Sequence, residues 1–150
     1  MTTFVVDASV AIKWVVEEPD SDIALRIRGA DRLVAPELWV AECANILWKK
    51  VRRGELTPGQ ALDAAETLRA AGVEVIAGEP TLPQLVSLAI SLDHPAYDCV
   101  YLNLAIGNGW ILATADRRLL DRLSGSDIER HSLSVDDAAR LVAASVLPQG

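Results

Sequence analysis

A chain of 150 residues with 51% hydrophobic residues has the size of one domain built on one core. Its net charge of −7 argues against nonspecific coating of nucleic acid, although a divalent ion could invert the field at an acidic site. Without a membrane-length apolar run or a signal-peptide pattern, we expect one cytoplasmic domain with no membrane association, spanning residues 1–150 and ordered to about residue 144 before a short C-terminal tail. Cys43 and Cys99 lack metal-like spacing, so they are expected to be buried thiols.

The first half of the sequence alternates strand and helix patterns. Phe4–Val6 is continuously apolar, as expected for a central parallel strand covered on both faces, and Leu33–Ala35 predicts a short second strand. Thr57 and Gln60 form a capping-box pattern, and the helix that they open should form a hairpin with the helix before it. Helices are expected at 8–16, at 21–30 with Asp20 or Ser21 as the cap, at 36–53 with Pro36 in the first turn and Gly54 as the stop, and at 57–72.

The second half repeats the alternation. Val73–Ala77 predicts a strand that Glu74 leaves half exposed, and Asp93-His94-Pro95 interrupts a helical pattern, so His94 is interpreted as a turn residue. The remaining elements are helices at 81–92, 96–106, 117–123 and 134–144, a strand at 110–113 and a possible edge strand at 128–133. This order predicts an α/β fold, namely a single-domain three-layer α/β/α sandwich with a mostly parallel central sheet.

Four carboxylates stand alone in apolar company. Asp7 is the only charged side chain among the first twelve residues. Glu42 and Asp98 lie within similar apolar stretches, and Asp116 comes at the end of one. A buried ionised carboxylate without a partner costs several kcal/mol. Asp7 and Asp116 directly follow strands, and Glu42 and Asp98 lie about one turn into helices that start from the same sheet edge. We therefore expect the four acids to converge on a cation at this edge.

Each acid also has an ordinary structural interpretation. Asp7 and Asp116 are typical N-caps of the helices that follow them. Glu42 would suit a solvated helix face, and Asp98 would suit a first helical turn, where the dipole favours an acid. Only the conjunction of the four acids favours a functional site.

Such a cluster matches a hard divalent ion. Two carboxylates about 4 Å apart repel by about 4 kcal/mol at an effective dielectric of about 20, and Mg²⁺ or Mn²⁺ would offset that repulsion. Zinc is disfavoured because His94 and His131 form no spaced pair and no cysteine accompanies them. A carboxylate-bound metal suits phosphodiester hydrolysis. Ser9 would then bind a ligand or water, and Thr114 would orient Asp116.

Other polar residues close to the acids have two interpretations each. Asn45 would orient Glu42 or touch substrate, or it would be a buried helical amide satisfied by the protein. Lys49 opens a basic run that would grip RNA phosphates or complement the helix dipole. Arg117 and Arg118 are better placed for a phosphate, although one of them would only neutralise the site.

These motifs, taken in order, resemble those of the PIN-domain ribonucleases, and especially the VapC toxins of bacterial and archaeal toxin–antitoxin pairs. The resemblance rests on Val5–Ser9, on Glu42 with Asn45, on 97–105 and on 113–119, and it covers nearly the whole chain at family spacing. It implies that Asp7, Glu42, Asp98 and Asp116 are the catalytic quartet that binds Mg²⁺ or Mn²⁺, supported by Ser9, Asn45 and Thr114.

The resemblance further implies an endoribonuclease that cleaves RNA, often tRNA or rRNA, with a metal-activated water. It implies a homodimer and a small antitoxin whose C-terminal tail covers the site. Two alternatives stay open: a non-catalytic PIN-fold interaction module and a receiver-like domain with an acidic pocket. A receiver would want an acidic neighbour for Asp7 and a late lysine, whereas no lysine follows Lys50.

Overall fold

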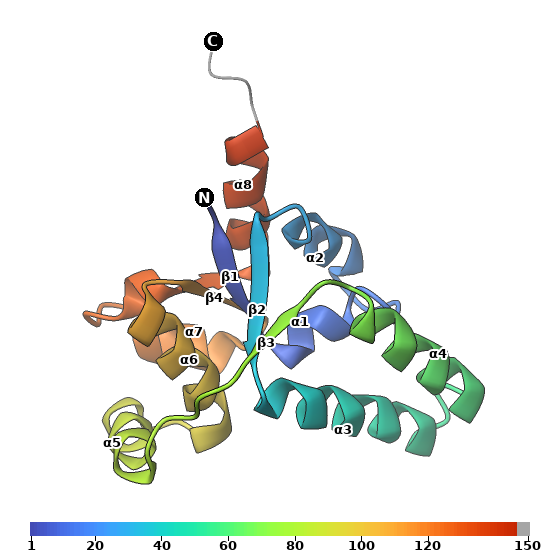
Figure 1. Cartoon of the computed structure of the whole chain (residues 1–150), viewed down its shortest axis with the longest axis horizontal. Helices are drawn as coiled ribbons and strands as arrows, with labels where there is room; N and C mark the ends of the chain where they lie inside the picture. Colours follow the sequence, from blue (N-terminus) through green and yellow to red (C-terminus); the bar gives the residue numbers. More distant parts are fainter. Residues whose placement is uncertain (147–150) are drawn as a thin grey trace.

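The computed structural model describes residues 1–146, and it contains a five-stranded sheet of order β3-β2-β1-β4-β5 (Figure 1). Every neighbouring pair of strands is parallel. The strands are β1 (Thr3–Val6), β2 (Arg32–Pro36), β3 (Glu74–Ile76), β4 (Ile111–Thr114) and β5 (Ser132–Ser134). The α/β/α sandwich predicted from the alternation of elements is confirmed.

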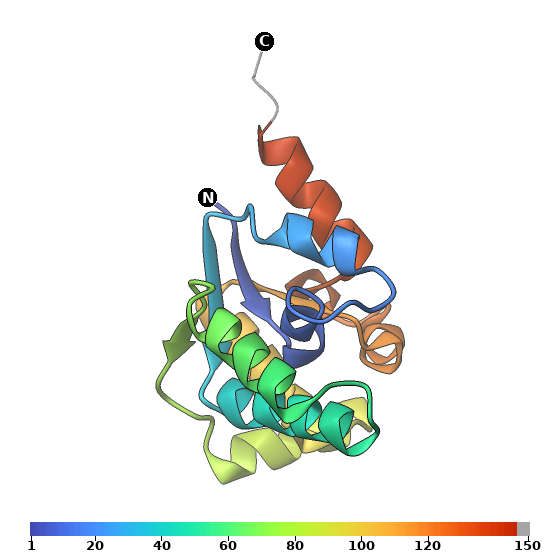
Figure 2. The same ribbon diagram turned by 90° about the vertical axis from the view of Figure 1, so that its right-hand side faces the viewer.

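Helices form the two outer layers. α6 contacts β1, β2 and β4 from one face and is backed by α5, whereas α1 contacts β4 from the other face, where α2 packs along α8 (Figures 1 and 2). α3 and α4 form the predicted hairpin. The helices are α1 (Ala8–Ile12), α2 (Ser21–Ile27), α3 (Leu38–Arg52), α4 (Pro58–Arg69), α5 (Leu82–Leu92), α6 (Ala96–Asn108), α7 (Arg117–Leu123) and α8 (Val135–Val146), with a 3₁₀ turn η1 (Glu129–His131). Over residues 1–146, none of them is long and apolar enough to cross a membrane.

Several boundaries differ from those predicted. The first helix ends at Ile12, because the next amides turn to i→i+3 bonds, with Lys13 N–H donating to Val10 and Trp14 N–H to Ala11. Pro36 does not open α3; it pairs with Ile76 at the end of β2, where the ladder does not require its missing N–H.

Two further boundaries shift near the C-terminus. Most of the run 128–133 is not strand, because η1 occupies 129–131 and pairing with β4 begins only at Ser132. α8 continues through Val146, two residues past the predicted end at Ala144. The expected C-terminal tail therefore falls largely on residues 147–150, which lie outside the described residues.

The strand order positions the functional edge. The chain leaves β1 toward β2 on one side and leaves β4 toward β5 on the other, so the order of winding reverses between β1 and β4. Ligand sites of parallel sheets form at the carboxyl ends of strands at this switch point. The buried strands β1 and β4 end there, at Val6 and Thr114. Asp7 follows Val6 directly, and Asp116 follows Thr114 with one residue between them.

Candidate active site

A buried threonine joins the ends of the two central strands. Thr114 Oγ1 donates to Asp7 Oδ2 at 2.9 Å and accepts the backbone N–H of Asp116 at 3.0 Å. The predicted support of Asp116 by Thr114 thus runs through the backbone, while the side-chain contact is to Asp7. Asp7 is only 7% exposed, and this burial raises its pKa, although hydrogen bonds from Ser9 and Thr114 oppose the rise.

Glu42 reaches the same edge from α3. Burial raises the pKa of Glu42, and the charge of Asp7 adds to the effect. The Tyr101 hydroxyl is near enough to oppose this rise. Even so, within residues 1–146 neither Glu42 Oε1 nor the Tyr101 hydroxyl has a hydrogen bond of normal geometry, although both atoms are buried. A buried carboxylate oxygen without a partner favours a ligand such as a cation.

Asp98 is paired with a histidine that sequence reasoning placed only in a turn. His94 Nε2 lies 2.6 Å from Asp98 Oδ2 and 3.5 Å from Asp116 Oδ2, and its side chain is 4% exposed. Burial raises the pKa of Asp98 to about 6; the charges of Asp116 and Asp7 add to the shift, and the hydrogen bond with His94 opposes it. The imidazole therefore belongs to the acid cluster.

The chain fixes His94 from both sides. Asp93 ends α5 in the left-handed conformation (φ 48°), and Pro95 caps α6. His94 N–H donates to the Ala89 carbonyl at 3.2 Å. The signal available in the sequence was a histidine directly before the Pro95 cap and four residues from the lone acid Asp98, so the two side chains are close along the chain.

The ordinary interpretation of two acids as helix caps is also correct. Asp7 accepts the N–H of Ser9 at 3.2 Å, and Asp116 Oδ1 accepts the N–H groups of Arg118 and Leu119 at 2.9 and 3.2 Å. Asp116 Oδ2 remains directed at His94. Because each carboxylate oxygen accepts more than one bond, capping orients these acids without exhausting them.

The four acids open into one cleft. A cavity of about 330 Å³ is lined by all four predicted acids, with Ser9 and Ile46 in its wall. One donor atom from each of His94, Asp98 and Asp116 falls within 4.8 Å of the others. A carboxylate-rich set with a buried, unpartnered oxygen fits a hard divalent ion such as Mg²⁺ or Mn²⁺.

The supporting residues divide into those that line the cleft and those that do not. Ser9 Oγ is buried and has no hydrogen-bond partner in the described part of the chain, so it is available to a ligand. Asn45 is exposed and does not line the cleft, so its interpretation as a buried amide is wrong, and no hydrogen bond links it to Glu42 in residues 1–146.

The basic residues predicted for a phosphate lie around the cleft. Arg118 lines an adjoining cavity with Asp98 and Asp116, and Arg117 is exposed beside it. Lys49 lines a cavity on the opposite side.

Both cysteines are buried free thiols, as predicted from their spacing. Burial and the charge of Asp7 raise the pKa of Cys43 to about 12, and burial raises that of Cys99 to about 11. Neither thiol is therefore a nucleophile near neutral pH. Hydrolysis in this cleft would depend on the acids.

The fold and the acid cleft together define a PIN domain. Residues 4–125 match the PIN domain model, and the chain belongs to that family, as its motifs indicated. It is a VapC-type member. It is 33% identical to Ribonuclease VapC3 of Pyrobaculum aerophilum over 121 residues, which cover 79% of this chain and 92% of that relative. It is 27% identical to Exonuclease VapC9 of the same organism over 104 residues, 69% of this chain and 77% of the relative.

A solved structure supports the same architecture. The crystal structure of PAE2754 from Pyrobaculum aerophilum superimposes with a TM-score of 0.73 and covers 95% of this chain and 98% of its own. Its sequence identity of 24% supports the fold alone.

Proposed function

We propose that the protein is a Mg²⁺- or Mn²⁺-dependent endoribonuclease and the toxin of a VapBC-type pair. The observation that carries this proposal is the convergence of Asp7, Glu42, Asp98 and Asp116 on one cleft, although more than a hundred positions separate the first from the last. The pKa of Asp7, of Glu42 and of Asp98 is raised there. Such a cluster is unfavourable in isolation and is relieved by a divalent cation.

Each residue has a distinct task in this proposal. The four carboxylates hold the cation, which when bound polarises the phosphoryl oxygen and lowers the pKa of the attacking water. Thr114 fixes Asp7 through its hydroxyl, and His94 fixes Asp98. The free Ser9 hydroxyl would hydrogen-bond a phosphate oxygen or water, and Arg118 would neutralise charge at the rim of the cleft.

The direct test is hydrolysis of labelled RNA with millimolar Mg²⁺ or Mn²⁺. Chelation with EDTA should abolish cleavage, and so should Asp7→Asn or Asp98→Asn, because each step removes the cation or a ligand. Cleavage that survives both controls would refute the mechanism. If no RNA of any class were cut, the fold would serve as a non-catalytic interaction module.

The partners are proposed from the family and from the relatives. VapC3 is named a ribonuclease, which favours RNA as the substrate here, with tRNA and rRNA as the first classes to test. A small antitoxin would cover the cleft, and the pair would work in the cytoplasm. RNA end-mapping tests the substrate, and co-purification of a small protein partner tests the antitoxin.

A homodimer is also proposed. α5 presents Leu82, Val86 and Ile90 to solvent at four-residue spacing, with Leu82 and Ile90 each 74% exposed. An apolar stripe of this kind favours burial against a second copy. Light scattering should give twice the chain mass of 16.1 kDa, and Ile90→Glu should give the single chain mass. A monomer at every concentration of the unaltered protein would refute the dimer.

A further inference from the structure

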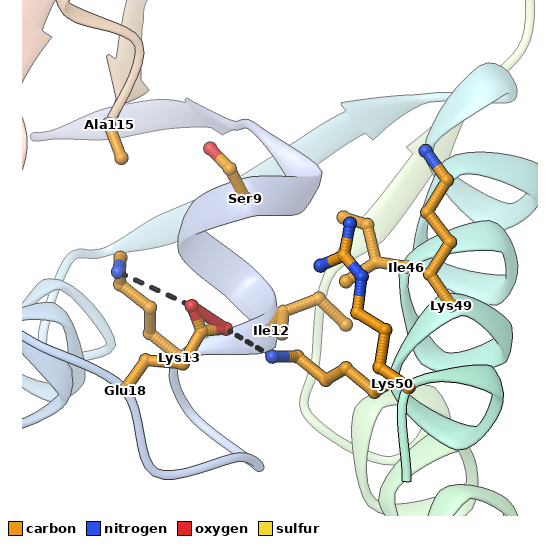
Figure 3. A pocket seen from close by; sticks show the side chains of 9 residues that line it. Ser9, Ile12, Lys13, Glu18, Ile46, Lys49, Lys50 and Ala115 are labelled. Atoms are coloured by element: carbon orange, nitrogen blue, oxygen red, sulfur yellow. Dashed lines mark ion pairs between the residues drawn. The ribbon is translucent and has the colours of Figure 1, made fainter. Parts of the chain in front are cut away.

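The acid cleft continues into cavities on both sides. Toward α7, Asp98 and Asp116 also line a cavity of about 610 Å³ that includes Arg118 and Arg122. Toward α1 and α3, the cleft shares Ser9, Ile46 and Ala115 with a cavity of about 340 Å³, called here the α3 pocket (Figure 3). The three cavities therefore adjoin along the carboxyl edge of the sheet, with the acids in the middle.

One face of α3 connects the acids to the α3 pocket. Glu42, Ile46, Lys49 and Arg53 follow one another at spacings of four, three and four residues, which places them in a single stripe. At 1.5 Å per residue, Lys49 lies about 10 Å from Glu42 along the helix. Consecutive phosphates are at least about 3.4 Å apart along a strand, so this distance spans no more than about three nucleotides.

The charge of the α3 pocket is opposite to that of the cleft. Four of its lining residues are cationic, and only one, Glu18, is acidic. Glu18 lies between Lys13, at 3.7 Å, and Lys50, at 3.5 Å, and holds both ammonium groups at one wall (Figure 3). Lys50 also contacts Glu55, at 3.3 Å. These two lysines are thus partly neutralised and held in place.

Lys49 and Arg53 remain available. Both are exposed, and within residues 1–146 neither forms an ion pair. Ser9 Oγ, buried without a partner, lies where the α3 pocket meets the acid cleft. A protein with a net charge of −7 repels a polyanion over most of its surface, so a basic pocket beside the cleft is a favourable place for a phosphate.

We infer that the α3 pocket is a binding subsite for a backbone phosphate of single-stranded RNA, one to about three nucleotides from the scissile bond. Lys49 and Arg53 contact the phosphate, and the pair of lysines on Glu18 keeps the pocket positive. The inference rests on the proposed function for the identity of the polymer. It assigns the pocket to affinity and register, not to base recognition.

The test measures RNA binding separately from hydrolysis. A labelled single-stranded RNA is titrated with the full-length Asp7→Asn protein in Mg²⁺, followed by fluorescence anisotropy, with and without Lys49→Ala/Arg53→Ala. The double variant should raise Kd at least about tenfold at low salt and flatten the plot of log Kd against log salt by about 0.7, the contribution of one neutralised phosphate on a single strand. Lys49 is an exposed helical position and Arg53 is the exposed C-cap of α3, so both positions tolerate alanine.

Arg52→Ala is the matched control. It removes one positive charge from the same end of α3, against two in the double variant, and its guanidinium lies over the Trp48 ring at 5.5 Å and does not line the pocket. It should change Kd by less than about threefold. An unchanged Kd in the double variant, or an equal loss in Arg52→Ala, would overturn the subsite. Weaker binding in the double variant, with no RNA hydrolysis by the unaltered protein, would support the subsite while refuting the proposed nuclease.

Discussion

Replacing Asp98 by Asn should stabilise the metal-free protein while destroying its site. The pKa of Asp98 rises from 3.8 to about 6, chiefly through burial, so near pH 7 the folded state carries a charge that the unfolded chain tolerates better. A shift of about two pKa units, at about 1.4 kcal/mol each, gives a free-energy penalty of about 3 kcal/mol for the buried charge. Because the side chain is only 24% exposed, removing the charge should recover most of this penalty. Asparagine keeps the size and a hydrogen-bonding group for His94. We expect unfolding free energy to increase by about 2 kcal/mol.

Urea unfolding in EDTA near pH 7, followed by the fluorescence of the four tryptophans, measures this change. Asp63→Asn on α4 removes an exposed acid outside the cluster and should stay within about 0.5 kcal/mol of the unaltered protein. Millimolar Mn²⁺ should then stabilise the unaltered protein and leave Asp98→Asn almost unchanged, because the ion binds the folded cluster only. A neutral or destabilising Asp98→Asn in EDTA would contradict the account of a strained acid cluster.

Three further predictions follow from the same contacts. The folded-state pKa of Asp98 lies above its unfolded value, so the folded metal-free protein should hold an extra proton below about pH 6. Its stability should therefore fall by up to about 3 kcal/mol as pH rises from about 4 through about 6. Urea midpoints that rise over this range in EDTA would contradict this prediction. Thr114→Val should cost about 3 kcal/mol, since it removes a bond to Asp7 and orphans the Asp116 N–H, whereas Thr114→Ser should cost less than half as much in the same denaturation assay. His94→Ala should weaken Mn²⁺ and Mg²⁺ binding to a similar extent, about tenfold when measured by calorimetry, because His94 holds Asp98 in place and does not itself bind the ion; a loss confined to Mn²⁺ would contradict this role.

Much of the fold could be predicted from local pattern because the central strands are buried on both faces. Phe4–Val6 and Leu112–Ala113 are wholly apolar and fully buried, and the capping box of Thr57 and Gln60 marks its helix start unambiguously. Boundaries were harder where tertiary contacts decided them. Pro36 has the local signature of a first helical turn, yet pairing with β3 keeps it in the strand.

The acids could be found in the sequence because a charge in an apolar run is rare, and because strand ends of a parallel sheet meet at one edge. The contacts that hold these acids in place could not be predicted from the sequence. The shared hydroxyl of Thr114 depends on β1 and β4 lying side by side with Val6 opposite Ala113, which no local pattern specifies. His94 was harder still, since a residue before proline has the local appearance of a turn, and only the burial of its ring against two carboxylates shows its part in the cluster.

The basic end of α3 has two interpretations in the sequence, of which the helix-dipole one is the plainer. Lys49 and Arg53 satisfy the helix-dipole explanation as well as the phosphate explanation, because both need only cations in the last turns. Residues remote in sequence support the phosphate interpretation, which stays a proposal. Lys13, the C-cap of α1, and Glu18 in the segment after it line a pocket together with the end of α3, and this pocket shares Ser9 with the acid cleft. A dipole needs no such enclosure, whereas a phosphate held in register with the scissile bond does.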